Sequence, residues 1–260
     1  MNDTKYSRCY FLWRHGDAFD GAHLSPPKPL VEIGGRPILW HIMKYYSRYG
    51  FNEFILALGY KGEMIKRYFL DFYTLRQDFT VGLENGQIRM INENHGEKWT
   101  VHLVDTGLET QTGGRLKRLT ELLGKGAFMM TYGDGVCDVN LDDLLKFHKK
   151  QRPLVTLTAV RPPARFGALE FQGVKIDHFK EKSTLHESWI NGGFFVIEQK
   201  ALDYIQEDNV MWEHAPMETM AAAGKVCGYQ HEGFWQCMYT ARDLLFESLW
   251  ETGQPPWKTW

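Results

Sequence analysis

Strand and helix patterns alternate along the first 160 residues of this chain, and the alternation limits the folds open to it. Short apolar runs bounded by turn residues indicate strands, and apolar residues at helical spacing indicate helices. Strands are expected at 54–59, 101–105, 127–132 and 154–160. Helices are expected at 37–49, 61–73, 115–123 and 141–149. The alternation predicts an α/β fold with a largely parallel sheet flanked by helices.

The remaining stretches are less regular. Residues 74–98 show the weakest pattern, and we interpret them as a lid or an interface arm. From about residue 165 the pattern changes to short strands with glycine turns, and it ends in a helix near 240–252. No repeat or low-complexity linker divides the chain. One domain is therefore expected over 23–260, preceded by a different segment over 1–22.

Two glycine turns follow predicted strands, where a parallel sheet binds its ligands. Thr106-Gly107 follows the strand at 101–105, and Gly133-Asp134 follows the strand at 127–132. A carboxylate between two glycines at a strand end suits a hard cation such as Mg²⁺. An ordinary turn aspartate is the alternative interpretation of Asp134.

Two basic residues are candidates for neutralising phosphate. Lys28 lies between two prolines, so a stiff backbone carries it as a point charge. Arg115 follows Gly113-Gly114 at an expected helix start, where backbone N–H groups and a guanidinium fork suit a phosphate or a nucleotide edge. The alternatives are a solvated surface lysine and an arginine in a surface ion pair.

Composition excludes some classes of partner. The net charge of −2 gives no indication of a nucleic-acid or membrane partner, and no apolar run approaches the roughly 18 residues of a membrane span. The four cysteines show no C-x-x-C spacing, as expected for reduced thiols in a cytoplasmic protein. Three histidines, His41, His102 and His231, lack metal-ligand spacing and are expected to be packing or surface residues.

An ordered set of motifs carries a resemblance to one family. The motifs are K-P-L-V-E-I-G-G-R-P-I-L-W-H-I-M (28–43), L-V-D-T-G (103–107), T-G-G-R-L-K-R (112–118), T-Y-G-D-G-V (131–136), R-F-G-A-L (165–169), I-N-G-G-F-F (190–195), G-F-W-Q (233–236) and P-W-K-T-W (256–260). Over roughly 23–260 the chain resembles the glucose-1-phosphate cytidylyltransferases, which make CDP-glucose for dideoxysugar and O-antigen biosynthesis. Two of these motifs, T-G-G-R-L-K-R (112–118) and P-W-K-T-W (256–260), separate this family from the glucose-1-phosphate thymidylyl- and uridylyltransferases.

The resemblance implies a Rossmann-like nucleotidyltransferase fold, a mixed and mostly parallel sheet, and a homo-oligomer, specifically a hexamer. It implies transfer of a cytidylyl group from CTP to α-D-glucose 1-phosphate, with Mg²⁺ as cofactor. Lys28 and Arg115 would be catalytic and Asp134 would hold the metal. The implied substrate-binding residues are Lys28, Thr112, Arg115, Gly133, Lys182 and Asn191.

The chain departs from the family at two functional places. The family opens with a strand and G-G-x-G-T-R, whereas this chain reads R-C-Y-F-L-W-R-H-G-D-A-F over 8–19. Trp13 and His15 would fill the space that phosphates need, and their β-carbons disfavour the positive φ that glycine allows. Tyr239 occupies the second metal-ligand position, and a neutral phenol is a poor magnesium ligand.

Codon degeneracy suggests an origin for the first departure. Read one nucleotide later, permitted codons for 8–19 give G-V-I-F-C-G-G-M-G-T-R-L, which is a strand followed by the missing loop. Trp13 has only the codon TGG, so it must yield glycine in that frame. We hypothesise two compensating indels, one before Arg8 and one between Phe19 and Ala22, in the gene or in its sequencing.

These departures leave alternatives open. One is a catalytically impaired member of the family that binds sugar nucleotide or forms oligomers as a scaffold. Another is a metal-dependent glycosyltransferase, although Gly133-Asp134-Gly135 offers one carboxylate where a D-x-D pair is wanted. Without the family's first strand a sheet position would be empty, and Tyr10-Phe11-Leu12 is apolar enough to fill it.

Overall fold

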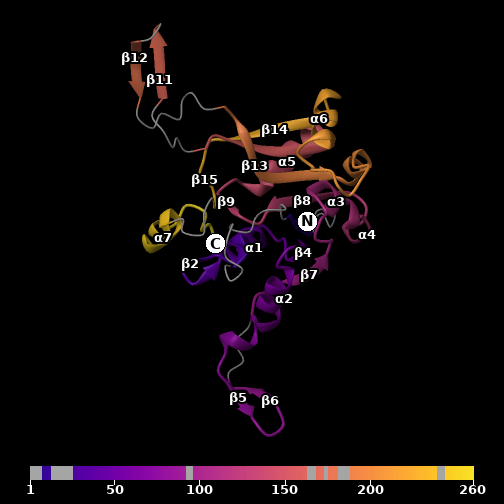
Figure 1. Ribbon diagram of the computed structural model, residues 1–260, viewed down its shortest axis with the longest axis vertical. Helices are drawn as coiled ribbons and strands as arrows, with labels where there is room; N and C mark the ends of the chain where they lie inside the picture. Colours follow the sequence, from indigo (N-terminus) through magenta and orange to yellow (C-terminus); the bar gives the residue numbers. More distant parts are fainter. Residues whose placement is uncertain are drawn as a thin grey trace.

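Seven strands form the central sheet of the computed structural model, in the order β14-β10-β13-β8-β1-β4-β7 (Figure 1). The structure describes residues 8–12, 26–91, 96–162, 168–172, 175–180, 188–238 and 244–260. The strands are β1 (Arg8–Leu12), β4 (Glu53–Leu58), β7 (Thr100–Asp105), β8 (Ala127–Tyr132), β10 (Val155–Val160), β13 (Ile190–Glu198) and β14 (Val226–His231). Four neighbours, β8, β1, β4 and β7, are parallel, while β13 is antiparallel to both β8 and β10. The predicted mixed, mostly parallel sheet is confirmed.

Helices cover both faces of the sheet. They are α1 (Ile38–Arg48), α2 (Gly62–Asp71), α3 (Thr112–Arg118), α4 (Thr120–Leu123), α5 (Leu141–Gln151), α6 (Ala215–Ala222) and α7 (Leu244–Glu251), with short 3₁₀ turns η2 (Lys28–Leu30), η3 (Thr74–Arg76) and η5 (Gln199–Tyr204). The helix expected at 115–123 begins three residues earlier and is split at Leu119. Within the described ranges, no helix has the length and apolar composition that a bilayer crossing demands.

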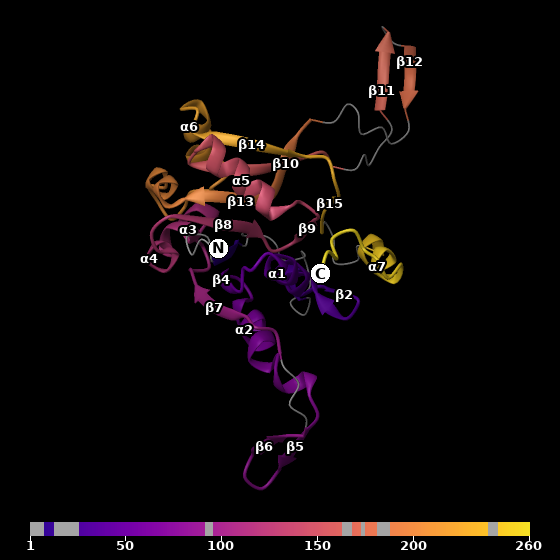
Figure 2. The same cartoon turned by 180° about the vertical axis from the view of Figure 1, so that it is seen from behind.

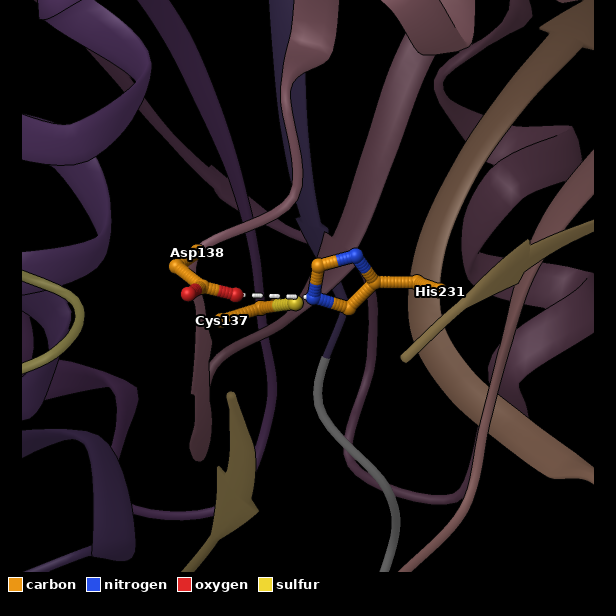
Figure 3. Close-up of side chains that lie close together, drawn as sticks. All are labelled: Cys137, Asp138 and His231. Carbon is orange, nitrogen blue, oxygen red and sulfur yellow. Dashed lines mark hydrogen bonds and ion pairs between the residues drawn. The ribbon is translucent and has the colours of Figure 1, made fainter. Parts of the chain in front are cut away.

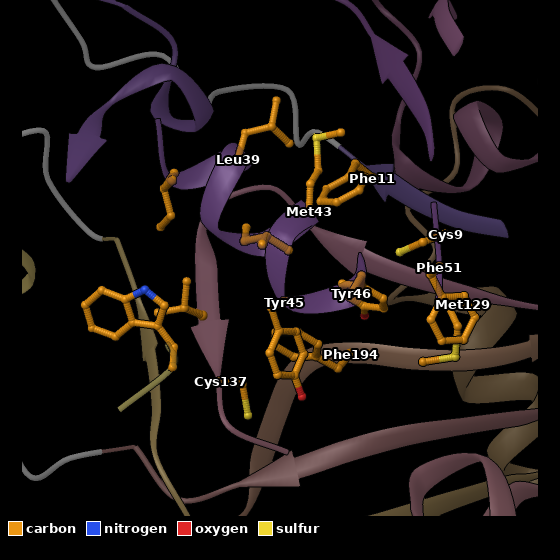
Figure 4. Close-up of a cluster of buried hydrophobic side chains, with 14 of the residues drawn as sticks. Cys9, Phe11, Leu39, Met43, Tyr45, Tyr46, Phe51, Met129, Cys137 and Phe194 are labelled. Carbon is orange, nitrogen blue, oxygen red and sulfur yellow. The ribbon is translucent and has the colours of Figure 1, made fainter. Parts of the chain in front are cut away.

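The N-terminal strand β1 lies in the middle of the sheet, between β4 and β8. Its side chains alternate between the faces. Cys9 and Phe11 join the cluster around α1 (Figure 4), and Tyr10 joins the cluster on the opposite face. All three are fully buried. A strand buried on both faces needs a continuous apolar run, and the sequence prediction for Tyr10-Phe11-Leu12 is confirmed.

Small antiparallel pairs surround the main sheet. They are β2 (Glu32–Ile33) with β3 (Arg36–Pro37), β5 (Phe79–Gly82) with β6 (Gln87–Met90), β9 (Gly135–Cys137) with β15 (Trp235–Cys237), and β11 (Ala168–Gln172) with β12 (Lys175–Lys180). The pairs β5–β6 and β11–β12 project at opposite ends of the molecule (Figures 1 and 2). The expectation of only short strands beyond 165 is wrong for β13, which has nine residues and joins the main sheet because its apolar run packs on both faces.

The C-terminal tryptophans pack against α1 and the preceding glycine turn. Gly34 has φ +57°, and a β-carbon there would overlap the indole of Trp250. His41 donates from Nε2 to the Ile33 carbonyl at 2.9 Å and accepts from Trp257 Nε1 at 3.4 Å. Both ring nitrogens of the neutral imidazole are therefore engaged, and burial lowers the pKa of His41 to about 4. His41 is a packing residue, as expected.

Candidate active site

A cavity of about 310 Å³ opens where β8 ends beside β13. The parallel strands β8, β1, β4 and β7 all end at this edge of the sheet, which is where α/β sheets bind ligands. The cavity is lined by Lys28, Thr131, Tyr132, Asp134, Gly135, Ile190, Asn191, Gly192, Gly193, Phe194, Trp235, Cys237 and Met238. The predicted residues Lys28, Asp134 and Asn191 therefore share one cavity, although the sequence separates them widely.

Lys28 and Asp134 face each other in this cavity. The Lys28 ammonium lies 3.8 Å from Asp134 Oδ2, and both side chains are about one-fifth exposed. The lysine begins η2, which the flanking prolines favour because the first turn of a helix needs no donor from them. Asp134 lies in the turn between β8 and β9, and its carbonyl accepts from Met238 N at 2.7 Å. A cation and a carboxylate are thus held on well-supported turns.

A β-bulge brings Asn191 to the cavity. Between β10 and β13 the register shifts: Leu157 pairs with Phe195 and Ala159 pairs with Asn191, so one residue of β10 lies opposite three residues of β13. Gly193 adopts φ +80° there, and its N–H donates to Asn191 Oδ1 at 2.9 Å. The Trp235 indole donates to the carbonyl of Gly192 at 2.7 Å. Such bulges re-aim side chains near active sites, and here the amide of Asn191 lies within 3.4 Å of the Tyr132 hydroxyl.

Glu213 joins the cavity to the start of α3, and sequence reasoning missed it. One carboxylate oxygen accepts from the Tyr132 hydroxyl, and the other accepts from the Thr112 hydroxyl at 2.7 Å. Tyr132 in turn contacts Asn191 at the bulge. A lone glutamate far from the motifs gives no local signal, because its partners come together only when the sheet forms.

Arg115 lies in the protein interior. Its side chain is 1% exposed, and Nη1 donates to the Leu58 carbonyl at 2.9 Å and to Thr106 Oγ1 at 2.6 Å. The guanidinium presses against Gly59, where a β-carbon would come within 2.4 Å of it. Burial lowers the pKa of this guanidinium. The placement differs from the expected contact with phosphate: Arg115 ties the end of β4 to the loop after β7.

The start of α3 is also occupied by protein groups. Gly113 N donates to the Val210 carbonyl at 2.9 Å, and a β-carbon at Gly114 would collide with the Asp208 carbonyl. The buried hydroxyl of Thr112 accepts from Trp212 N at 2.9 Å while it donates to Glu213. The glycine pair therefore allows close packing against residues 208–212, where we had expected backbone N–H groups open to phosphate.

The remaining predicted residues do not line the cavity beside β8 and β13, or lie outside the described part of the chain. Gly133 is buried in the turn before Asp134. Lys182 and Tyr239 lie outside the described residues. A larger cavity of about 930 Å³ lies between α2 and the β2–β3 turn, and its charged lining includes Glu32, Arg36, Arg67 and Asp71. Of the predicted substrate and metal residues that the structure describes, none lines it.

Comparisons with known proteins show the family and the fold of this chain. The nucleotidyl transferase family model matches residues 24–235. Glucose-1-phosphate cytidylyltransferase of Salmonella typhi is 46% identical over 236 residues, covering 90% of this chain and 91% of that protein. A probable glucose-1-phosphate cytidylyltransferase of Bacillus subtilis is 41% identical, covering 90% and 92%. Among solved structures, HddC from Yersinia pseudotuberculosis complexed with GMP-PN has a TM-score of 0.64 at 17% identity, covering 95% and 99%, which is a likeness of fold.

Proposed function

The chain belongs to the nucleotidyl transferase family and, within it, to the glucose-1-phosphate cytidylyltransferases, and we propose that the cavity beside β8 and β13 is where it transfers a cytidylyl group from CTP to α-D-glucose 1-phosphate. The products are CDP-glucose, which would serve dideoxysugar synthesis, and pyrophosphate. The observation that carries the proposal is the Lys28–Asp134 pair at the carboxyl edge of the sheet. The names of the relatives support CTP and glucose 1-phosphate as substrates.

The reaction joins two anions, so charge and orientation are the main demands on the protein. A phosphate oxygen of glucose 1-phosphate attacks the α-phosphorus of CTP, and the bond from that phosphorus to the bridging oxygen of pyrophosphate breaks. The Lys28 ammonium is placed to offset negative charge on the phosphates. The Asn191 amide, aimed by the bulge, orients the sugar phosphate together with Lys182 and the backbone at Gly133.

A divalent cation fits one side of this cavity. The Asp134 carboxylate faces it as a hard oxygen ligand, the type that Mg²⁺ prefers. Such an ion would neutralise phosphate charge during the transfer. Tyr239 stands at the family's second ligand position, so Asp134 is the residue we assign to the ion. Arg115 and Thr112 are assigned as positioning residues, which hold the β4 and β7 ends and the start of α3.

The altered segment at 8–19 and Tyr239 favour a second candidate function, a family member that binds sugar nucleotide or assembles without turning over. The described part of that segment, β1, keeps the sheet complete. Folding is therefore compatible with both candidates, and only turnover separates them.

Three versions of the chain test the proposal: the sequence as it stands, one with 8–19 replaced by G-V-I-F-C-G-G-M-G-T-R-L, and that replacement combined with Tyr239→Asp. Pyrophosphate release is measured with glucose 1-phosphate, Mg²⁺ and each of CTP, UTP, dTTP, GTP and ATP. We expect release with CTP in at least the third version. Release in the first would mean that the altered loop and Tyr239 are tolerated.

Silence in all three versions with calorimetric binding of CDP-glucose would support the scaffold function. Silence without binding of CTP or CDP-glucose would overturn the assignment of the cavity. Resequencing the gene across 8–22 tests the indel hypothesis separately.

We also propose a homo-oligomer, a hexamer, with the α2 and β5–β6 surface as an interface. Large apolar side chains are exposed there: Leu70, Leu75, Val81, Leu83, Ile88 and Ile91. Leu83 is 91% exposed, and several exposed large apolar side chains on neighbouring elements support an interaction site there. Light scattering should give a molar mass of six 30.3 kDa chains, and Leu83→Glu should lower it.

A further inference from the structure

The side chains of Cys137, Asp138 and His231 lie close together (Figure 3). Cys137 ends β9, Asp138 follows it, and His231 ends β14. Their ligand atoms, the thiol sulfur, a carboxylate oxygen and an imidazole nitrogen, all lie within 4.8 Å of one another. The Asp138 carboxylate and His231 Nε2 are 2.8 Å apart.

The surroundings of this cluster are close and mostly enclosed. The Cys137 side chain is 1% exposed, and burial raises the pKa of its thiol. Gly233 passes directly against the other two residues, since a β-carbon there would come within 2.5 Å of Asp138 Oδ1 and 2.8 Å of His231 Nε2. The Asp138 N–H donates to the Phe234 carbonyl at 3.1 Å, which fixes the same loop over the cluster. The chain is thus arranged closely around the three groups.

We propose that Cys137, Asp138 and His231 bind one thiophilic divalent cation, of which Zn²⁺ is the representative, in a site separate from that of Asp134. Sulfur, nitrogen and oxygen ligands together suit tetrahedral Zn²⁺, whereas Mg²⁺ prefers oxygen alone. Three protein ligands leave a fourth position for water. The pairwise limit of 4.8 Å lets the three atoms reach a common ion with small side-chain rotations.

Binding has a proton balance. The Cys137 thiol loses its proton to solvent and gives a sulfur–metal bond. The His231 nitrogen that now bonds Asp138 offers a lone pair in place of that bond, and the ring proton resides on its other nitrogen. Affinity therefore falls as the pH falls, because protons compete for the ligands.

The ion would connect β9 to the end of β14. Asp134 lies in the turn that leads into β9, so the bridge would hold the metal-facing turn of the candidate active site against the segment that begins at Gly233. A ligand that binds only the folded state raises the melting temperature. At a free Zn²⁺ concentration 100-fold above the dissociation constant, we expect an increase of about 5–10 °C for a chain of this size.

Cobalt reports the ligands directly. Co²⁺ titrated into the full chain should give tetrahedral visible bands together with a sulfur-to-cobalt charge-transfer band in the near ultraviolet. Cys137→Ser should abolish the charge-transfer band and weaken Zn²⁺ binding at least about 100-fold. The matched control is Cys227→Ser, which alters a half-buried cysteine on β14, the strand that ends in His231. It should leave both signals unchanged.

The wild-type spectrum decides the matter even if a variant folds poorly. A spectrum without a charge-transfer band, or no Co²⁺ or Zn²⁺ binding at micromolar free metal, overturns the proposal. So does a band that survives Cys137→Ser or disappears with Cys227→Ser. Mg²⁺ alone should give no melting shift through this site, which separates its outcome from that of the Asp134 proposal.

Discussion

Lys28 and Arg115 looked alike in sequence, since each is a cation beside helix-start residues in a motif, but they lie in contrasting places. Lys28 reaches a cavity and faces a carboxylate across 3.8 Å. Arg115 is buried and donates to the Leu58 carbonyl and the Thr106 hydroxyl. Lys28 is placed to respond to a ligand, whereas Nη1 of Arg115 already donates to two groups of the protein.

The contrast shows that a motif determines which side chain is present but not whether that side chain reaches a cavity or is buried in the interior. The glycines before Arg115 let α3 approach residues 208–212, and the arginine side chain itself is buried. The prolines around Lys28 hold a short turn at the cavity instead. Four experiments test whether cavity-facing groups act on activity and buried groups act on stability.

Replacing Lys28 should have the largest effect, and on activity alone. We expect Lys28→Met to lower kcat/KM by roughly 10²–10³-fold, or about 3–4 kcal/mol, because phosphate charge in the transition state loses its cation. The free energy of unfolding should change by less than about 0.5 kcal/mol, since partly exposed ion pairs contribute little. Pyrophosphate release and urea unfolding measure the two quantities in whichever version turns over. Lys150→Met, at an exposed helix end, is the control; equal losses in both variants would remove Lys28 from the site.

Low pH should lower the free energy of unfolding through His41, which is buried between α1 and the C-terminal tryptophans. Its pKa is about 4 in the folded protein against 6.5 in the unfolded chain, so the neutral form is favoured by folding. This contribution is present above pH 6.5 and is lost as the pH falls to 4, amounting to about 3 kcal/mol. Protonation would place an N–H at Nδ1, against the Trp257 donor. Urea unfolding from pH 7 to 4 should show a shallower decline in His41→Gln than in wild type; identical slopes would contradict the argument.

Arg115 should behave in the opposite way to Lys28. Arg115→Met should lower the free energy of unfolding by about 2 kcal/mol, because the Leu58 carbonyl and Thr106 hydroxyl lose a charged donor. Below the melting range, kcat should fall by less than about tenfold if the arginine only positions the loop. Arg118→Met, which breaks an exposed pair with Asp208 and a hydrogen bond to the Thr106 carbonyl, should cost about 1 kcal/mol. A stable but inactive Arg115→Met would restore Arg115 to direct contact with substrate.

Replacing Glu213 should have the smallest effect on stability. Its carboxylate links the cavity, through Tyr132, to the start of α3, through Thr112. Glu213→Gln keeps the shape but removes an acceptor, so either Tyr132 or Thr112 loses its partner at a cost of about 1 kcal/mol. Because Tyr132 contacts Asn191, the KM for glucose 1-phosphate should rise several-fold while the KM for CTP changes less. Glu218→Gln, exposed on α6, should change neither. An equal rise in both KM values would argue against a link to Asn191.

Much of the fold followed from local patterns. The strands at β4, β7, β8 and β10 and the helices α1, α2 and α5 were predicted within a few residues, because apolar periodicity and bounding glycines are local properties. Even β1 was foreseen from its apolar run. The antiparallel insertion of β13 was not, since its pairing with β8 and β10 depends on chain segments far away in sequence.

The site divides in the same way. Lys28, Asp134 and Asn191 could be named from their motifs, and the structure brings them to one cavity. Glu213 and the Cys137–Asp138–His231 cluster could not, because Asp138 and His231 are 93 residues apart and only the packing of β9 near β14 joins them. No spacing rule spans such a distance.

The sequence by itself determined the family, the alternation of strands and helices, and the chemical identity of the groups at the carboxyl edge. Tertiary structure decided which of those groups face the cavity and which are enclosed. The physical reason is that periodicity and turn residues act over a few positions, whereas burial depends on the close approach of distant backbones. Gly113-Gly114 shows this most directly, because its close contact is with residues 208–212, which lie far away in the sequence.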